Sequence, residues 1–279
     1  MKIRDTSSGA CVGGASYAGA MVDRTRGVLY PARLPSFHRL PPPAHAAALA
    51  SWFWIPEWSL PDGEVSRQEI VSYPAVNLVV APDGVSISGA TTRVSTRELR
   101  GAGWAVGALL RPAAVPALTD DASELVDAER AFDAPDLHAA VTTAMRSADG
   151  RRERAVAVFA AWLSQRVGPV GASGRQANAM LDVLLGEGAA LTPEEAATRL
   201  AVSVRTLQRL THRTVGLSPG AIIRRRRLQE AAQRLREEPE TDLTALAATL
   251  GYADHAHLTR DFAAVLGLPP RDYRARVSD

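Results

Sequence analysis

The sequence predicts an α+β protein with a β-rich barrel or sandwich domain in its N-terminal part and an all-α C-terminal domain that has two helix-turn-helix units joined by a long helix. Three observations predict this class. Short runs rich in Val, Ile and Trp, separated by Pro and Gly, occupy residues 24–118. Helical periodicity replaces them from Asp120 onward. About the last hundred residues contain a helix, turn and helix pattern twice.

The length of 279 residues is typical of about two domains. We expect a β-rich regulatory or sensor domain over 1–118, a helical linker region over 119–174 and a helical domain over 175–279. The chain is 46% hydrophobic and 22% charged, which is enough apolar material for packed cores. Its single cysteine, Cys11, excludes an internal disulfide. Such low cysteine usage is typical of a reducing cytoplasm, where we expect the protein. No apolar run is long enough to span a membrane, so we expect no membrane partner.

The N-terminal strands are expected at residues 51–55, 75–80, 85–88 and 104–110, where β-branched and aromatic residues cluster. Asp62-Gly63 and Asp83-Gly84 are turn signals next to such runs. Short strands with Asp-Gly turns are typical of a compact barrel or sandwich.

The first strong helical pattern covers residues 151–167. Apolar residues recur there at intervals of three and four, namely Ala155, Val158, Phe159, Trp162 and Leu163. This stripe is a candidate dimerisation surface, and packing against its own domain is the alternative. The glycines within residues 171–174 then predict a flexible joint.

The first helix-turn-helix unit begins at Thr192, an N-cap residue followed by Pro193 at the first helical position and by Glu195, which can complete a capping box. Ser203 is the N-cap residue of the second helix. The outward face of that helix carries side chains that can bond base edges in a major groove: Arg205, Gln208, Arg209 and His212. A solvated surface is the alternative for such a face in a single unit.

A second unit follows a helix of about 18 residues that starts at Ser218-Pro219. Asp242 and Asp254 are N-cap residues for its two helices. The outward residues of the second of these are His255, Ala256, Thr259 and Arg260. The connecting helix spans about 27 Å, which is close to the major-groove repeat of about 34 Å. Two recognition helices in successive grooves are therefore expected.

Several motifs of the C-terminal part occur together and in order: Leu207-Gln208-Arg209-Leu210, Val215-Gly216-Leu217-Ser218-Pro219, Arg227-Leu228-Gln229-Glu230-Ala231, Leu258-Thr259-Arg260-Asp261-Phe262 and Gly267-Leu268-Pro269-Pro270. In combination they resemble the DNA-binding domain of the AraC/XylS transcription regulators, over about residues 179–276. The resemblance implies an AraC-type DNA-binding domain of seven helices at 175–279. It also implies that base edges are approached by Arg205, Thr206, Gln208 and Arg209 in the first unit and by His255, Ala256, Thr259 and Arg260 in the second.

Two departures from the family pattern concern affinity. Ala263 and Ala264 stand where many relatives carry basic or aromatic residues, and Asp261 adds a negative charge. We therefore expect the first unit to dominate specificity. The run Arg224–Arg227 lies on the connecting helix, and we expect one or two of these side chains to meet phosphate, because four consecutive residues cover all sides of a helix.

The N-terminal half shows a looser resemblance to the β-rich domain of one branch of AraC-like regulators, carried by residues 30–33, 37–41, 49–54 and 103–114. The resemblance implies effector sensing or dimerisation by this half. Candidate lining residues of an effector pocket for an apolar or planar molecule are Trp52, Trp54, Tyr73 and Trp104, and a packed core is the alternative role for these aromatic side chains.

Catalytic residues, cofactors and metal ions are not expected. The glycines at 101, 103 and 107 have the wrong spacing for a dinucleotide loop, and the histidines of the β-rich half lack metal-ligand spacing. Cys11 has no neighbouring Cys or His and is expected to be a plain small residue. An enzymatic first half fused to a DNA anchor stays as a third interpretation of the chain.

The sequence therefore predicts a bacterial, sequence-specific DNA-binding transcription regulator that is not an enzyme. Double-stranded promoter DNA is its expected partner, and a small-molecule effector, a second copy of the chain and RNA polymerase are further candidates. Control is expected through the N-terminal half, by an effector or by dimerisation. The alternative is a ligand-independent regulator whose N-terminal half is only a dimerisation or architectural module.

Overall fold

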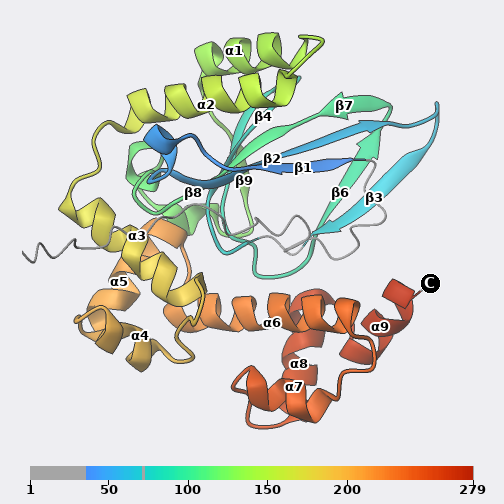
Figure 1. Cartoon of the computed structure of the whole chain (residues 1–279), viewed down its shortest axis with the longest axis vertical. Coiled ribbons are helices and arrows are strands. Elements are labelled where there is room, and N and C mark those ends of the chain that lie inside the picture. The colour runs from blue at the N-terminus through green and yellow to red at the C-terminus, as the bar shows by residue number, and fades with distance from the viewer. Residues whose placement is uncertain (1–35, 71–72, 279) are drawn as a thin grey trace, which may run out of the picture.

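The computed structural model describes residues 36–70 and 73–278. It shows an antiparallel sheet with two helices on one face, and a group of helices on the opposite side of the sheet (Figure 1). The predicted α+β class, with a β-rich N-terminal part and a helical C-terminal part, is confirmed. Cys11 and residues 30–33 lie outside the described residues.

The larger sheet has the strand order β1-β2-β8-β4-β5-β9, with β7 paired to the end of β2. Its strands are β1 (Phe37–Leu40), β2 (Ala50–Ser59), β4 (Asn77–Ala81), β5 (Gly84–Ser88), β7 (Ala102–Trp104), β8 (Val106–Leu110) and β9 (Glu129–Ala131). A separate antiparallel pair consists of β3 (Val65–Ile70) and β6 (Ser95–Arg100). Within the described residues β1 and β9 end the strand order, so this sheet is open rather than closed into a barrel.

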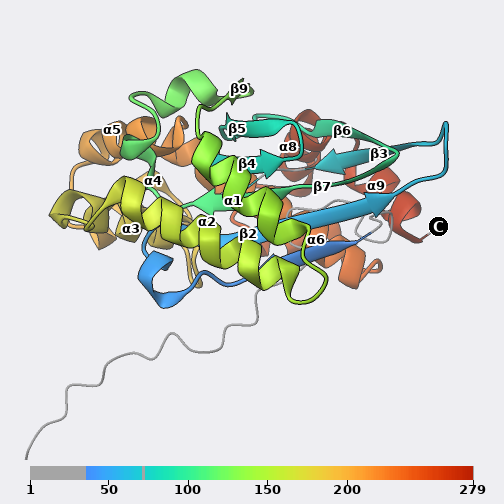
Figure 2. The same ribbon diagram turned by 90° about the horizontal axis from the view of Figure 1, so that it is seen from above.

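The two faces of the larger sheet have different neighbours, because successive side chains of a strand point to opposite faces. On β2, Phe53 and Ile55 are fully buried in the core beneath α1 (Pro135–Met145) and α2 (Arg151–Val167). The Phe53 and Phe159 rings meet edge to face, with centroids 5.4 Å apart. Figure 2 shows both helices lying across the strands. Trp52 and Trp54 alternate with these residues and face the other side.

Residues 119–174 pack on the sheet. The short 3-10 helix η4 (Ala122–Leu125) and β9 precede α1 and α2, and β9 pairs with β5. The predicted stripe of α2 lies in the core of the sheet, including Ala155, Phe159 and Leu163. Residues 171–174, expected as a flexible joint, instead contain the start of a helix at Ala172. Burial explains both outcomes, because an apolar helix face gains free energy when it leaves water. The stripe of α2 packs against the sheet, whereas the apolar face of α3 packs against α4, α5 and the start of α6.

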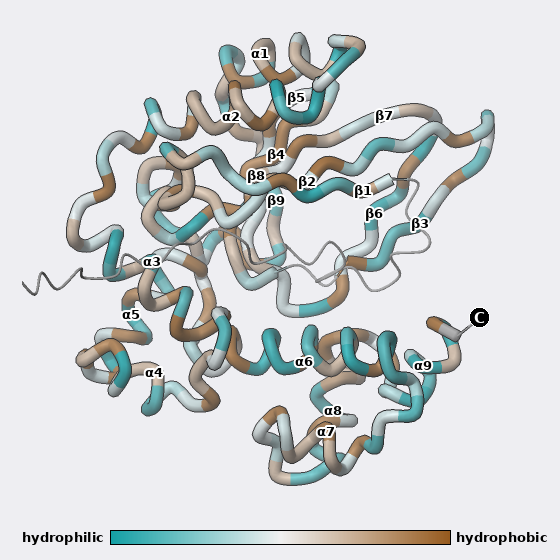
Figure 3. The backbone as a smooth tube through the Cα atoms, in the orientation of Figure 1, coloured by the Kyte–Doolittle hydropathy of each residue, from teal (hydrophilic) through white to brown (hydrophobic). Residues whose placement is uncertain are grey.

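The C-terminal part consists of α3 (Ala172–Leu185), α4 (Pro193–Arg199), α5 (Val204–Val215), α6 (Pro219–Glu237), α7 (Leu243–Thr249), α8 (His255–Leu266) and α9 (Pro270–Ser278). Two apolar clusters hold it together. One joins α3, α4, α5 and the start of α6, and the other joins the rest of α6 with α7, α8 and α9. Figure 3 shows brown, apolar segments on the strands beneath α1 and α2, whereas much of α6 is teal and polar.

Each predicted helix start of this part is confirmed. The side chains of Thr192, Ser203, Ser218, Asp242 and Asp254 each accept a hydrogen bond from the backbone N–H three residues later. Such caps satisfy backbone donors that have no partner within the helix. Local capping therefore fixes where α5 and α8 begin, and these are the two helices that carry the predicted reading residues.

Candidate nucleic-acid interface

The first candidate reading helix, α5, is amphipathic. Leu207 and Thr211 are fully buried on its inner side. The predicted reading residues Arg205, Gln208, Arg209 and His212 are exposed, and Thr206 is half-buried. The Ser203 Oγ atom accepts a hydrogen bond from the Thr206 N–H at 3.1 Å, which fixes the first turn. The arrangement allows several hydrogen-bonding side chains of one helix face to approach a groove together.

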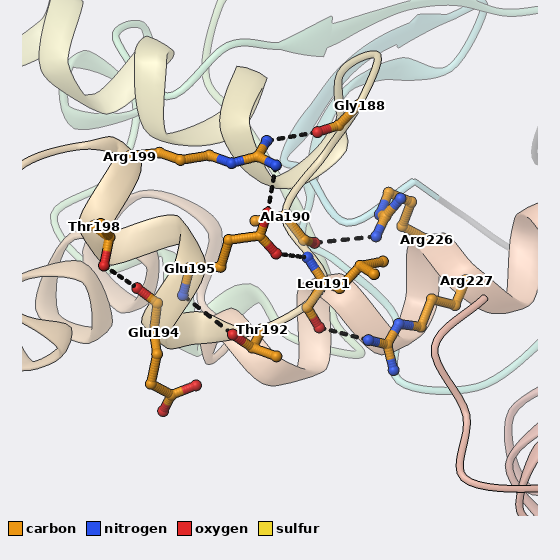
Figure 4. A network of polar contacts seen from close by, with 10 residues as sticks. All are labelled: Gly188, Ala190, Leu191, Thr192, Glu194, Glu195, Thr198, Arg199, Arg226 and Arg227. Atoms are coloured by element: carbon orange, nitrogen blue, oxygen red, sulfur yellow. Dashed lines mark hydrogen bonds and ion pairs between the residues drawn. The ribbon is translucent and has the colours of Figure 1, made fainter. Parts of the chain in front are cut away.

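A polar network fixes α4, the helix that precedes α5 (Figure 4). The Leu191 N–H donates to Glu195 Oε2 at 2.8 Å, and the Glu195 N–H donates to Thr192 Oγ1 at 3.1 Å. The hydrogen bond from Leu191 is the main reason that the pKa of the Glu195 carboxyl lies below its usual value. The predicted capping box is therefore present in a variant form, because Glu195 reaches the residue before the N-cap.

The second candidate reading helix, α8, presents His255, Ala256 and Arg260 to solvent, and Thr259 is half-buried. The His257 N–H donates to Asp254 Oδ1 at 2.7 Å. This hydrogen bond lowers the pKa of Asp254, and the nearby Arg260 charge adds to the effect. Leu258 and Phe262 anchor the inner side of the helix and are fully buried. The two reading helices therefore share the same construction, with a capped start and an exposed polar face.

Each of the four guanidinium groups of the run Arg224–Arg227 on α6 has a partner within the protein. Arg224 pairs with Asp261 of α8 at 3.2 Å. Arg225 donates to Thr91 Oγ1 of the N-terminal domain at 2.7 Å. Arg226 donates to the Ala190 carbonyl at 3.1 Å, and Arg227 donates to the Leu191 carbonyl (Figure 4). The expected phosphate contact stays a prediction, and Arg224 is the exposed member of the run.

Asp261 is the negative charge that the sequence adds to the second unit. Its carboxylate pairs with Arg224 and lies 3.9 Å from His257 Nε2. The side chain of Asp261 is only 18% exposed, so this charge is largely compensated inside the protein. The remaining departure is the absence of basic side chains at Ala263 and Ala264.

Acidic residues of the N-terminal half lie beside the first reading helix. Asp120 and Asp121 line an open hollow of about 320 Å³ together with Arg209, His212 and Arg213. The pKa of Asp121 is lowered, mainly by the Ser123 hydroxyl and to a smaller extent by His212. No sequence signal indicates this neighbourhood, because about ninety residues of chain separate the two sets. The acidic pair adds negative charge close to the expected path of phosphates.

The aromatic residues proposed for an effector pocket divide between the two faces of the sheet. Trp52 meets Tyr73 edge to face at a centroid distance of 4.9 Å, and Arg39 lies over the Trp52 ring at 5.0 Å. Trp54, two residues along the same strand, donates from Nε1 to Asn77 Oδ1 at 3.1 Å. These residues share one face, which is the face opposite to α1 and α2.

Trp104 does not join this group. It lies directly across from Glu57 in the β2–β7 register, and the Glu57 carboxylate pairs with Arg151 and Arg152 of α2. Trp104 also packs against the core beneath the helices. The sequence alone could not assign Trp104 to a face of the sheet. That face depends on the register between β7 and β2, which only the structure shows.

Neither a metal-binding cluster nor a membrane-spanning helix occurs among the described residues. Residues 36–70 and 73–278 contain no group of three or more His, Cys, Asp or Glu side chains that could hold a metal ion. The same residues include no helix that is long and apolar enough to cross a membrane.

Comparison with known proteins gives matches in both halves. A family model described as a helix-turn-helix domain matches residues 196–276. A model described as a domain of unknown function (DUF6597) matches residues 38–130. The first match includes both reading helices, and the second includes most of the described strands.

Relatives from two Streptomyces species carry the family name. An AraC-like transcription regulator of Streptomyces lividans is 34% identical over 122 residues, which are 44% of this chain and 38% of the relative. One from Streptomyces antibioticus has the same identity and coverage. This chain thus aligns with well under half the length of these relatives.

Among solved structures, ToxT from Vibrio cholerae O395 has a TM-score of 0.41 at 8% identity, covering 81% of this chain and 98% of that chain. ToxT of Vibrio cholerae strain SCE256 with a bound unsaturated fatty acid has a TM-score of 0.40 at 10% identity, covering 80% and 94%. These scores are low, so the likeness to known regulators rests instead on the helix-turn-helix match and the Streptomyces relatives. On that evidence the resemblance of the C-terminal motifs is confirmed: residues 196–276 match a helix-turn-helix domain, and the chain is similar to AraC-like transcription regulators.

Proposed function

We propose that this protein is a sequence-specific, DNA-binding transcription regulator whose two helix-turn-helix units read promoter DNA, and that its N-terminal half controls that binding. The observation that carries the proposal is the shared construction of α5 and α8. Each is a capped helix with a buried inner side and an exposed polar face. In helix-turn-helix proteins such a helix lies in the major groove, and the residues of its N-terminal part contact bases.

The reading residues have suitable chemistry. Arg205 and Arg209 can each bond guanine O6 and N7, and Gln208 can bond adenine N6 and N7. In the second unit, Arg260 is the counterpart for guanine, and Thr259 can bond several bases. Double-stranded DNA also suits the charge of this half, since residues 151–279 hold 19 basic and 14 acidic residues whereas residues 1–150 hold 13 and 16.

The experiment is a selection of binding sites from random DNA, followed by affinity measurements on the site recovered. We expect Arg209→Ala and Arg260→Ala each to weaken binding by about 1–3 kcal/mol, with the larger loss for Arg209 because Ala263 and Ala264 offer no phosphate contacts. Arg234→Ala is the control, since Arg234 pairs with Glu230 on its own helix. Equal losses in the control, or no selected site, would contradict a reading role for these helices.

For the N-terminal half we propose an effector site on the sheet face that carries Trp52, Trp54 and Tyr73. Arg39 stacks on the Trp52 ring, and the Trp54 indole is hydrogen-bonded to the Asn77 amide on the same face. This combination of flat aromatic and polar groups suits a planar molecule with polar edges. The alternative is an N-terminal half that is only a dimerisation or architectural module. Dimerisation through the apolar stripe of α2 is disfavoured, because this stripe is buried against the sheet of the same chain.

A panel of planar aromatic compounds tests the effector site by thermal shift and tryptophan fluorescence. A true effector should raise the melting temperature of the wild type and of Trp104→Phe, because Trp104 lies on the other face. It should fail to do so for Trp52→Ala. Equal responses of the two variants would place the binding elsewhere, and no response from any compound would favour the ligand-independent alternative.

A further inference from the structure

One loop of the N-terminal domain touches both helix-turn-helix units. Residues 89–94 connect β5 to β6, and in Figure 1 this loop descends from the sheet towards α6. Ala90 is fully buried in the apolar cluster of the first unit. Val94, four residues later, packs against the cluster of the second unit. We call residues 89–94 the connector.

The connector binds the second reading helix through the backbone. The Val94 N–H donates to the Val265 carbonyl in the last turn of α8 at 2.9 Å. Carbonyls at this end of a helix have no partner within the helix, so an outside donor fixes the end in place. The contact leaves the N-terminal end of α8 exposed, where His255 and Ala256 lie.

The corresponding end of α5 meets residues 122–126. The sequence assigned this segment to the linker region, but it packs in the core of the sheet and is counted here with the N-terminal domain. Gly216 ends α5, and a Cβ atom at this position would stand 2.6 Å from the Ala122 carbonyl oxygen and 2.7 Å from Val126 Cγ2. Val126 also packs against the cluster of the first unit. The N-terminal domain therefore contacts both reading helices at their C-terminal ends.

Arg225 ties the connector to α6 between these two contacts. Its side chain is almost completely buried, donates to Thr91 Oγ1 at 2.7 Å and lies 3.4 Å from the Arg93 carbonyl. Asp127 supports the same loop, since its carboxylate accepts hydrogen bonds of 2.6 Å from the Thr92 N–H and Oγ1. Burial lowers the pKa of Arg225 to about 10, so the guanidinium is charged at neutral pH. A buried charge costs free energy that several directed hydrogen bonds offset.

We propose that the N-terminal domain is the frame that sets the mutual orientation of α5 and α8, with Arg225 and Thr91 as the positioning pair. The inference rests on the proposed reading of DNA by both helices. Neither Arg225 nor Thr91 needs to touch DNA. They act through the connector, which holds the end of α8 at a defined place relative to the end of α5. The frame therefore sets which spacing between two half-sites the protein accepts.

The first test compares the full-length wild type with Arg225→Met, Thr91→Val and the control Arg234→Met on DNA in which the half-site spacing varies. Adding two base pairs turns one half-site by about 70° around the DNA axis. A rigid pair of readers loses much of its tandem advantage, which is roughly 10²- to 10⁴-fold for well-matched geometry. We expect the wild type and Arg234→Met to lose at least about tenfold with this change, and the other two variants to lose less than about threefold.

Arg225→Met retains a long apolar side chain and Thr91→Val retains the shape of threonine, so two independent variants protect the test against a failure to fold. Melting temperatures and circular dichroism serve as the folding control. Equal weakening at all spacings would show a purely stabilising role and would overturn the proposal. An unchanged spacing preference in both variants would overturn it as well.

A second measurement needs no DNA. Spin labels at Thr198→Cys on α4 and Ala248→Cys on α7, both exposed and outside the reading faces, report the distance between the units in a Cys11→Ser background. We expect a narrow distance distribution in the wild type and a broader one in Arg225→Met and Thr91→Val. If the wild type selects no DNA site, the proposed function fails, and the spin-label distances still decide whether the frame exists. Identical distributions in all variants would overturn it.

Discussion

At the scale of single residues, the second reading helix depends on one carboxylate. Asp254 accepts the His257 N–H at 2.7 Å, so the start of α8 is fixed only while this acceptor is available in the right geometry. The carboxylate is also favoured at this end of the helix, where the backbone dipole is positive. His255 and Ala256, two proposed reading residues, lie within this first turn.

Acid should therefore loosen the start of α8. The folded-state pKa of Asp254 lies below its usual value of 3.8, because the ionised form accepts the His257 hydrogen bond. The stabilisation is present above the unfolded pKa and is lost as the pH falls through the folded pKa. We expect the His257 amide resonance in NMR to titrate with a midpoint below 3.8. Asp254→Asn, which keeps an acceptor, should abolish that titration, and a midpoint at or above 3.8 would contradict the assignment.

At the scale of elements, the two reading helices end in the same way but meet different surroundings. Gly216 and Gly267 end α5 and α8 with φ of +84° and +79°, a left-handed conformation that costs other residues about 1–2 kcal/mol. Space for a Cβ atom exists at Gly267, whereas at Gly216 the Ala122 carbonyl and Val126 occupy it.

A matched pair of substitutions separates backbone strain from contact with the N-terminal domain. Gly267→Ala should cost about 1 kcal/mol of unfolding free energy, because only the backbone conformation is unfavourable. Gly216→Ala should cost about 1–3 kcal/mol more, because the new methyl group overlaps the Ala122 carbonyl. Urea unfolding of both variants measures the difference. Equal losses would mean that the contact between η4 and α5 contributes nothing.

At the scale of the whole molecule, the charges of one half act on the other. Asp120 and Asp121 belong to the N-terminal half yet share a hollow with Arg209 and His212 of α5. Negative charge at this place opposes the approach of DNA phosphates to the first reading helix, and salt weakens the effect.

Removing one of these charges should strengthen binding to DNA of any sequence. We expect Asp120→Asn to raise affinity for a random duplex by roughly twofold at low salt and to have little effect at high salt. Asp62→Asn makes the same change in net charge in the exposed turn between β2 and β3, far from α5 in Figure 1, and serves as the control. Fluorescence anisotropy at two salt concentrations measures both variants. A similar gain in the control would assign the effect to net charge alone.

Local chemistry explains why the helical part could be predicted from the sequence. An N-cap such as Ser203 acts on a backbone donor three residues away, and an apolar stripe such as that of α2 repeats within two turns. Both are complete within a short segment of chain. The same reasoning predicted which residues of α5 and α8 face outward, because the buried residues of each helix define the opposite side.

The sequence by itself determined the helix starts, the similar construction of α5 and α8, and the resemblance to AraC-like regulators. Only the tertiary structure decided the partners of Arg224–Arg227, the face on which Trp104 lies and the contact of the connector with both units. Arg225 and Thr91, for example, are 134 positions apart. Such contacts depend on strand register and on how two apolar clusters pack, and neither leaves a periodic signal in the residues involved.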